Sequence, residues 1–298
     1  MNAARTTPPW PAASTQAKTL DELEKAGMTG STAYDAQEAI VDSSTADQSV
    51  VLRVQGLTKS YSGKPVLGGI DAEVRSGEFV CIVGPSGAGK TTLLRCLGGL
   101  MAPTEGAVYM DGVLVTQPPE KLAVVFQDYS RSLMPWMSVL SNVTLPLRSR
   151  GMSRAERHEA GLAALAGVGL EGCEQQYPWQ LSGGMQQRVA IARALAYQPE
   201  ALLMDEPFAS VDAQTRADLE DLILRVRQEF GVTVALVTHD IDEAVYLADR
   251  VLVLSGRPTT VRAVVDVPLP PERDQLHTKS LPEFGELRGQ VLKLIQEA

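Results

Sequence analysis

The stretch from Gly84 to Thr91 has the residue types and spacing of a loop that holds phosphate groups. It reads Gly-Pro-Ser-Gly-Ala-Gly-Lys-Thr and lies between the apolar run 79–83 and the helix-like run 92–97, the context that such a loop requires. Glycines let consecutive backbone N–H groups turn towards an anion, and the following helix N-terminus adds partial positive charge. A chance glycine-rich turn is the alternative, which the flanking runs disfavour. The residues expected to contact a nucleotide are Gly84, Pro85, Ser86, Gly87, Ala88, Gly89, Lys90, Thr91 and Thr92.

Carboxylates follow a second apolar run and complete the chemistry that this loop suggests. In the loop, Lys90 is expected to reach the β- and γ-phosphates of ATP, and the Thr91 hydroxyl to bind Mg²⁺. The run 201–204 ends in Asp205 and Glu206. Asp205 is a candidate ligand of the same Mg²⁺, and Glu206 can polarise a water molecule towards the γ-phosphate. Apolar strands often end in acids, so this pair gains its meaning from the phosphate loop upstream.

A second possible anion site begins at Ser182. The sequence Leu-Ser-Gly-Gly-Met-Gln-Gln-Arg over 181–188 places a serine and the glycines Gly183 and Gly184 at the start of a predicted helix. Free N–H groups at such an end can bind an anion. An ordinary serine N-cap is the alternative reading of the same residues.

The elements that must position these residues alternate along the chain. Apolar patterns predict strands at 50–54, 66–74, 107–110 and 122–126, then mainly helices over 139–196, where Ser153 and Glu156 have the spacing of a capping box. Strands and helices then alternate from 201 to 254, which predicts a parallel sheet with helical crossovers. A last strand is expected at 259–267 and a last helix at 282–296.

Composition limits the class of protein. The chain has 298 residues, of which 44% are hydrophobic, so it can form a sizeable core. Its net charge of −9 argues against a nucleic-acid partner. It has no apolar run long enough to cross a bilayer and no apolar signal-peptide core near its start, so we expect membrane contact only through a partner. The three cysteines lack metal-site spacing and are expected to be buried free thiols.

The first 48 residues differ in composition from the rest. They are rich in alanine, serine, threonine and acidic residues, with three prolines near the start. This composition predicts an acidic, disordered extension. A regulatory or docking role and a featureless tail both remain open for it.

Taken together, these motifs resemble the nucleotide-binding subunit of an ATP-binding cassette (ABC) transporter. The phosphate loop, Leu-Ser-Gly-Gly at 181–184, Leu-Leu-Met-Asp-Glu at 202–206 and Thr-His-Asp at 238–240 occur in that family's order, and the resemblance covers about residues 50–257. It implies an α/β fold: a P-loop NTPase core with a parallel sheet, an antiparallel β subdomain and a helical subdomain at about 138–196. The ATPase domain would span 49–257, and 258–298 would form a C-terminal strand and helix extension.

The resemblance also implies roles for single residues. Tyr61 would stack on adenine. Gln127 would bind the metal and water, and His239 would contact the γ-phosphate and hold the attacking water with Glu206. His158 and His277 are interpreted as surface residues.

A second copy of the chain is implied as well. Ser182, Gly183 and Gly184 would act on nucleotide held by the opposite copy of a head-to-tail dimer. Asp212 would lie at the dimer seam. The stretch before it departs from the usual Ser-Ala-Leu-Asp form at Ser210 and Val211, and Met185 stands where many members have Gln.

A narrower resemblance is to the importers of nitrate, sulfonates and taurine. It rests on residues 127–136, on Arg-Asp-Gln at 273–275 and on Pro-Glu-Phe at 282–284. It implies transmembrane permease subunits as partners, an extracytoplasmic solute-binding protein acting indirectly, and a location at the cytoplasmic face of the inner membrane. Leu133, Met134 and Trp136 would be exposed for docking to the permease, and a local hydrophobic cluster is the alternative.

Two other classes of protein remain alternatives. A soluble ABC-type ATPase would work without a permease, although such proteins usually carry tandem cassettes or coiled-coil insertions. A catalytically silent regulatory subunit conflicts with the presence of both Glu206 and His239. The transported solute is not readable, because such a subunit faces ATP and the permease.

Overall fold

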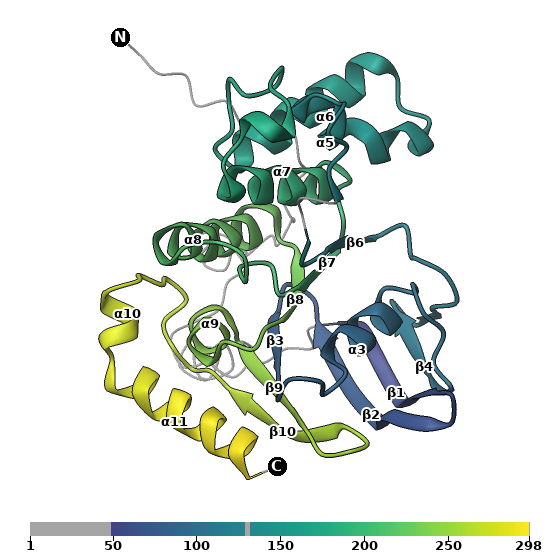
Figure 1. Ribbon diagram of the computed structural model, residues 1–298, viewed down its shortest axis with the longest axis vertical. Coiled ribbons are helices and arrows are strands. Elements are labelled where there is room, and N and C mark those ends of the chain that lie inside the picture. The colour runs from purple at the N-terminus through teal and green to yellow at the C-terminus, as the bar shows by residue number, and fades with distance from the viewer. Residues whose placement is uncertain (1–48, 129–131, 298) are drawn as a thin grey trace, which may run out of the picture. The chain divides into compact units, whose positions relative to one another are not determined.

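The computed structural model describes residues 49–128 and 132–297 (Figure 1). The predicted extension 1–48 lies outside the described residues, as do residues 129–131. Within the described ranges, no helix combines the length and the apolar character that a bilayer span requires.

A six-stranded sheet forms the centre of the fold (Figure 1). Five of its strands are parallel, as the alternation of elements predicts, and β10 pairs antiparallel with β9. Because successive side chains of a strand point to opposite faces, Cys81 and Ile82 of β3 enter two different hydrophobic cores. The strand order is β10 (Thr260–Asp266), β9 (Arg250–Ser255), β3 (Phe79–Val83), β8 (Thr233–Val237), β7 (Ala201–Asp205) and β6 (Leu122–Val125).

An antiparallel sheet and one helix cover the face of the central sheet that carries Ile82. The antiparallel sheet has the order β2 (Lys64–Arg75), β1 (Val50–Tyr61), β4 (Glu105–Met110) and β5 (Val113–Leu114). Asp111 and Gly112 join β4 to β5 with positive φ values of 49° and 76°, the conformation of a primed hairpin turn. Helix α3 (Lys90–Leu97) contributes Leu93, Leu94 and Leu97 to the core that this sheet shares with the central one.

Helices lie on the other side of the sheet. Helices α7 (Gly183–Ala196) and α9 (Ile241–Leu247) contact strands β6 and β3, respectively, and α8 (Ala213–Phe230) contacts both of these helices. Helices α5 (Val139–Thr144) and α6 (Arg154–Gly167) pack on α7, further from the sheet (Figure 1). The 3₁₀ turns of this region are η2 (Leu145–Arg150) and η3 (Pro178–Gln180). The predicted capping box is confirmed: Glu156 N donates to Ser153 Oγ at 3.2 Å, and Ser153 N donates to Glu156 Oε2 at 2.6 Å.

The C-terminal segment packs onto this helical face. Strand β10 extends the central sheet, and α10 (His277–Ser280) and α11 (Pro282–Gln296) follow. Phe284, Leu287 and Val291 of α11 are buried in the core on this side. Helix α9 contacts both α8 and α11 (Figure 1), so the last helix packs directly against a helix that covers the central sheet.

One expectation about exposure is wrong. Leu133 is only 2% exposed, whereas the sequence analysis places it on a docking surface. The Asn142 amide explains the inward turn, because its Oδ1 accepts from Met134 N at 2.7 Å and its Nδ2 donates to Met134 O at 3.1 Å. Leu133 thereby enters the core. Met134 is half-buried, and Trp136 is 74% exposed as expected.

The cysteines are free thiols as expected, although only two of the three are buried, and the remaining histidines lie on the surface as expected. All three cysteines are free thiols; Cys81 and Cys96 are buried and Cys173 is half-buried. Burial is the main cause that raises the pKa of the Cys81 and Cys96 thiols. His158 and His277 are exposed on the surface.

Candidate active site

The glycine loop turns tightly between β3 and α3 because two of its glycines leave room for neighbouring atoms. A Cβ at Gly84 would lie 2.7 Å from the carbonyl oxygen of Leu254 on β9. Gly89 has φ +75°, and a Cβ there would lie 2.7 Å from Val66 Cγ1. L-residues avoid this backbone region. Gly89 is also the N-cap of α3 and has no side chain to occupy the free N–H groups of the first turn, which leaves them available to an anion.

Lys90 is the first residue of α3 and lies inside the loop. Its Nζ donates to Gly84 O at 2.9 Å and to Pro85 O at 3.2 Å. Burial lowers the pKa of this ammonium group, and the nearby carboxylates of Glu206 and Asp205 act in the opposite direction. The loop carbonyls therefore hold a buried cation beside two acids.

Asp205 is the last residue of β7 and lies beside the start of α3. The Thr91 hydroxyl donates to Asp205 Oδ1 at 3.1 Å. Burial raises the pKa of this carboxyl, and the Thr91 hydrogen bond lowers it. A buried carboxylate beside a hydroxyl suits a hard cation that keeps water and substrate oxygens as its other ligands, which is how proteins bind Mg²⁺. These residues therefore fit the ion, although no group of three or more His, Cys, Asp or Glu side chains in the described ranges makes an independent metal cage.

Glu206 receives two polar partners from different elements. Gln127 Nε2 donates to Glu206 Oε2 at 3.2 Å, and His239 Nδ1 lies 3.1 Å from the same oxygen. Gln127 follows β6 and His239 follows β8, so the ends of neighbouring parallel strands bring all three together. The Glu206 backbone is left-handed, with φ 44°, and its N–H donates to Val237 O at 2.8 Å.

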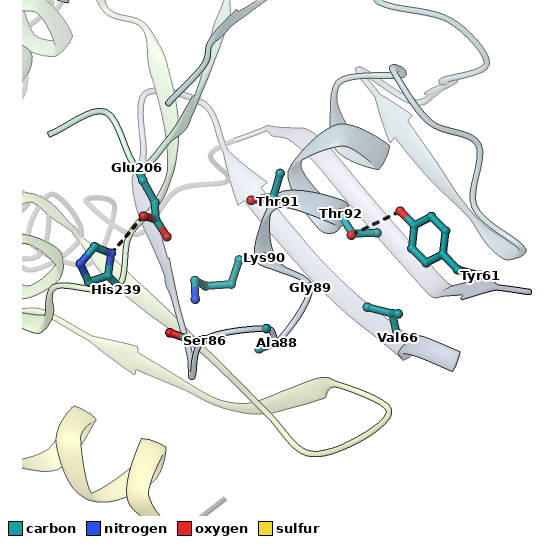
Figure 2. Close-up of a pocket in the computed structure, with 11 residues that line it drawn as sticks. Tyr61, Val66, Ser86, Ala88, Gly89, Lys90, Thr91, Thr92, Glu206 and His239 are labelled. Atoms are coloured by element: carbon teal, nitrogen blue, oxygen red, sulfur yellow. Dashed lines mark hydrogen bonds and ion pairs between the residues drawn. The ribbon is translucent and has the colours of Figure 1, made fainter. Parts of the chain in front are cut away.

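A pocket of about 560 Å³ lies over the loop. Figure 2 shows Tyr61 and Val66 at one end, Glu206 and His239 at the other, and Lys90 between them. Tyr61 is 43% exposed, and its hydroxyl donates to Met101 S at 3.1 Å. Val66 is a lining residue that no sequence motif marks, since its only signal is its place in the strand after Tyr61. The lining residues are Tyr61, Val66, Ser86, Gly87, Ala88, Gly89, Lys90, Thr91, Thr92, Glu206 and His239.

Seven of the candidate residues do not line this pocket. Gly84, Pro85, Gln127 and Asp205 lie next to residues that do, whereas Ser182, Gly183 and Gly184 lie at the start of α7. Ser182 is the N-cap and accepts a hydrogen bond from Met185 N at 3.3 Å. Ser182 and Gly183 are exposed, whereas Gly184 is buried. A Cβ at Gly184 would lie 2.3 Å from Thr215 Cγ2 of α8. Gly184 thus has a packing role in its own chain, which the sequence analysis did not anticipate.

Comparison with known proteins agrees with this geometry. The ABC transporter family model matches residues 67–209. An uncharacterized ABC transporter ATP-binding protein of Methanocaldococcus jannaschii is 49% identical over 252 residues, which are 83% of this chain and 92% of that protein. The chain belongs to the ABC transporter family. Two further relatives of this ABC protein are the taurine import ATP-binding protein of Yersinia pestis, 46% identical over 71% of the chain and 82% of the relative, and the nitrate import ATP-binding protein of Synechocystis, 41% identical over 82% and 95%.

Solved structures support the same assignment. A dimeric ATP-binding cassette in a post-hydrolysis state with ADP and phosphate matches the ABC protein with a TM-score of 0.64 and 36% identity, over 72% of this chain and 98% of that one. The fold prediction of a P-loop core with an antiparallel and a helical part is confirmed by this match. The ABC protein is an ATPase, and nucleotide is its substrate.

Proposed function

We propose that this ATPase powers an ABC importer of nitrate, taurine, another sulfonate or a related small anion. Two of its relatives are named as taurine and nitrate import ATP-binding proteins, at 46% and 41% identity. In this role it binds permease subunits at the cytoplasmic face of the inner membrane, and a solute-binding protein delivers the anion to the permease from outside. Exposed Trp136, after Gln127, is the candidate contact with the permease.

The pocket suggests how ATP binds. Adenine stacks on the exposed ring of Tyr61, and the phosphates lie over the loop from Gly84 to Thr92. Thr91, Asp205 and Gln127 would hold Mg²⁺, which when bound neutralises charge on the phosphate oxygens. The Thr91–Asp205 hydrogen bond of 3.1 Å supports the pairing of these two ligands.

Glu206 is the proposed general base, and its two partners carry the proposal. Both Gln127 and His239 lie within 3.2 Å of Glu206 Oε2, which orients the carboxylate towards the pocket that also contains Lys90. The Glu206 carboxylate takes a proton from water as the water oxygen attacks the γ-phosphorus, and the bond to the ADP oxygen breaks. Lys90 and His239 stabilise the charge on the transferred phosphoryl group.

A second copy of the chain is needed in this scheme. Ser182 and Gly183 are exposed at the start of α7, so their N–H groups can cover the phosphates of nucleotide held by the partner subunit. Asp212, at the N-cap of α8, would lie at the same seam. The backbone N–H of Thr215 and, to a smaller extent, its hydroxyl donate hydrogen bonds to the Asp212 carboxyl and lower its pKa. The Asp212 carboxylate therefore stays charged at the seam.

Purification of the full chain from membranes together with its permease tests the function. We expect permease subunits to co-purify, and vesicles with the complex to take up taurine or nitrate only when ATP is present. The same complex with Glu206→Gln should take up neither. Absence of any membrane protein from the purified material would contradict the importer assignment and favour a soluble ABC-type ATPase, whether or not the isolated chain hydrolyses ATP.

A further inference from the structure

We propose that Arg216 and Glu243 act as a pair that positions His239. The inference rests on the ATPase function and adds two residues to it. The His239 side chain is 58% exposed, and its polar contact is with Glu206. Its own packing therefore fixes it weakly, and its direction must come from Thr238 and Asp240 on either side.

Glu243 holds the first of these neighbours. Thr238 Oγ1 donates to Glu243 Oε2 at 2.6 Å, and the same Oγ1 accepts from Asp240 N at 3.0 Å. The Thr238 N–H donates to Ile82 O of β3 at 3.1 Å. A continuous chain of hydrogen bonds thus runs from the backbone beyond His239, through Thr238, to the carboxylate of Glu243 on α9.

Arg216 holds the second neighbour and joins the two. Its Nη1 lies 3.2 Å from Asp240 Oδ2, and its Nε lies 3.5 Å from Glu243 Oε1. Arg216 belongs to α8, and its backbone N–H donates to the backbone carbonyl oxygen of Asp212 at 2.9 Å. One guanidinium group therefore connects the first turn of α8 to both anchors of the His239 segment.

The electrostatics of the buried carboxyl require this partner. Glu243 is 5% exposed, and burial raises its pKa to about 7. Arg216 is the cation that faces the Glu243 carboxyl. The other titratable groups that face it are two acids, Glu220 of α8 and Asp240 at the N-cap of α9, and the thiol of Cys81 on β3. A buried charge without its partner is costly, so loss of Arg216 favours the protonated form of Glu243.

Neither residue lines the nucleotide pocket, so both are positioning residues. The expected signature of such a residue is a fall in kcat with little change in ATP binding, because ATP contacts are intact and only the alignment of His239 with Glu206 changes. A residue that only stabilised the fold would instead lower the amount of active protein and leave the pH profile unchanged.

The first test is phosphate release by the full-length chain without permease. We expect Glu243→Gln and Arg216→Met each to lower kcat about tenfold while ATP affinity changes less than about twofold. Asp242→Asn is the matched control: it removes the neighbouring acid of α9, which pairs with Arg288 at 2.6 Å on the exposed side, and should leave kcat unchanged.

Two further readouts separate positioning from stability. The double variant should lose less kcat than the product of the two single losses, because both changes break the shared Arg216–Glu243 contact. Glu243→Gln resembles the protonated carboxyl, so the wild-type kcat divided by the kcat of this variant should fall towards one as the pH drops below about 7. This ratio cancels any pH dependence that both proteins share.

The outcomes distinguish this inference from the proposed function. Wild-type kcat in both single variants, additive losses in the double variant, or a ratio independent of pH would each overturn the positioning role while hydrolysis itself continues. A wild-type chain that hydrolyses no ATP would contradict the function on which the inference rests.

Discussion

Helices α3 and α7 begin with the same local chemistry but in different surroundings. Each N-terminus follows or contains glycine and presents free N–H groups. At α3 the buried Lys90, Glu206 after β7 and Tyr61 line one pocket together with those groups. At α7 the Ser182 and Gly183 positions are exposed. A helix N-terminus therefore forms a complete anion site only where other elements contribute lining side chains and charges. Within the described part of its own chain, the N-terminus of α7 lacks such neighbours and needs a surface from another molecule to complete it.

Glu206→Gln tests the pocket at the start of α3 and has the largest expected effect. The amide cannot accept a proton from water, so we expect kcat to fall about 1000-fold while ATP binding persists. Phosphate release and ATP titration measure the two quantities. Glu200→Gln is the control, since Glu200 lies at the other end of β7 and pairs with Lys121 at 2.8 Å. Hydrolysis near the wild-type rate would exclude Glu206 as the base.

Lys90→Ala tests the same pocket through binding. Loss of the ammonium removes charge-assisted hydrogen bonds to the phosphates, so we expect ATP affinity to fall about 100-fold. Calorimetric titration with ATP measures it. Lys64→Ala removes an exposed lysine at the start of β2 and should bind as the wild type does. Equal affinities for the two variants would mean that the phosphates lie elsewhere.

Mixing two inactive variants tests whether the α7 end works on the partner subunit. Lys90→Ala weakens phosphate binding by the loop, and Ser182→Arg blocks the N-terminus of α7 with a bulky side chain. In a head-to-tail dimer of one copy of each, one pocket keeps an intact loop and an intact α7 end. We expect the mixture to recover hydrolysis that neither variant has alone. If mixing recovers nothing although the variants associate, both parts serve the same copy.

Gly184→Ala gives the smallest effect and separates packing from nucleotide contact. The new methyl group meets Thr215 Cγ2, so we expect the free energy of unfolding to fall by about 1–3 kcal/mol. Denaturant unfolding measures it. Thr215→Ser removes that methyl group and keeps the hydroxyl that donates to Asp212 Oδ2 at 2.7 Å, so the double variant should regain stability. Gly183→Ala, at an exposed position, should change stability by less than about 0.5 kcal/mol.

The sequence predicts most of the fold because its local signals and its burial pattern agree. The run before Gly84, the Ser153 capping box and the alternation after Ala201 each specify an element, and the structure has each of them. The proximity of Glu206 and His239 also follows, because each lies within two residues of the end of a parallel strand. The roles of these residues in catalysis stay predictions.

What the sequence does not reveal depends on contacts between distant segments. An apolar residue in a loop can turn inward or outward, and only the Asn142 amide decides that Leu133 turns inward. The Arg216–Glu243 contact joins α8 to α9, and the packing of Gly184 against Thr215 joins α7 to α8. No local pattern of residue types marks these pairs, since charged and small residues are common on helices.

The left-handed backbone of Glu206 implies a conflict between durability and activity at this position. A non-glycine residue in that region is strained by about 1 kcal/mol or more, and here the strained residue is the proposed base. Selection for heat resistance alone would favour glycine at 206, which relaxes the main chain and ends turnover. We expect Glu206 to persist only under selection for ATP hydrolysis. A library of variants at this position that is screened for thermal stability alone should therefore lose glutamate.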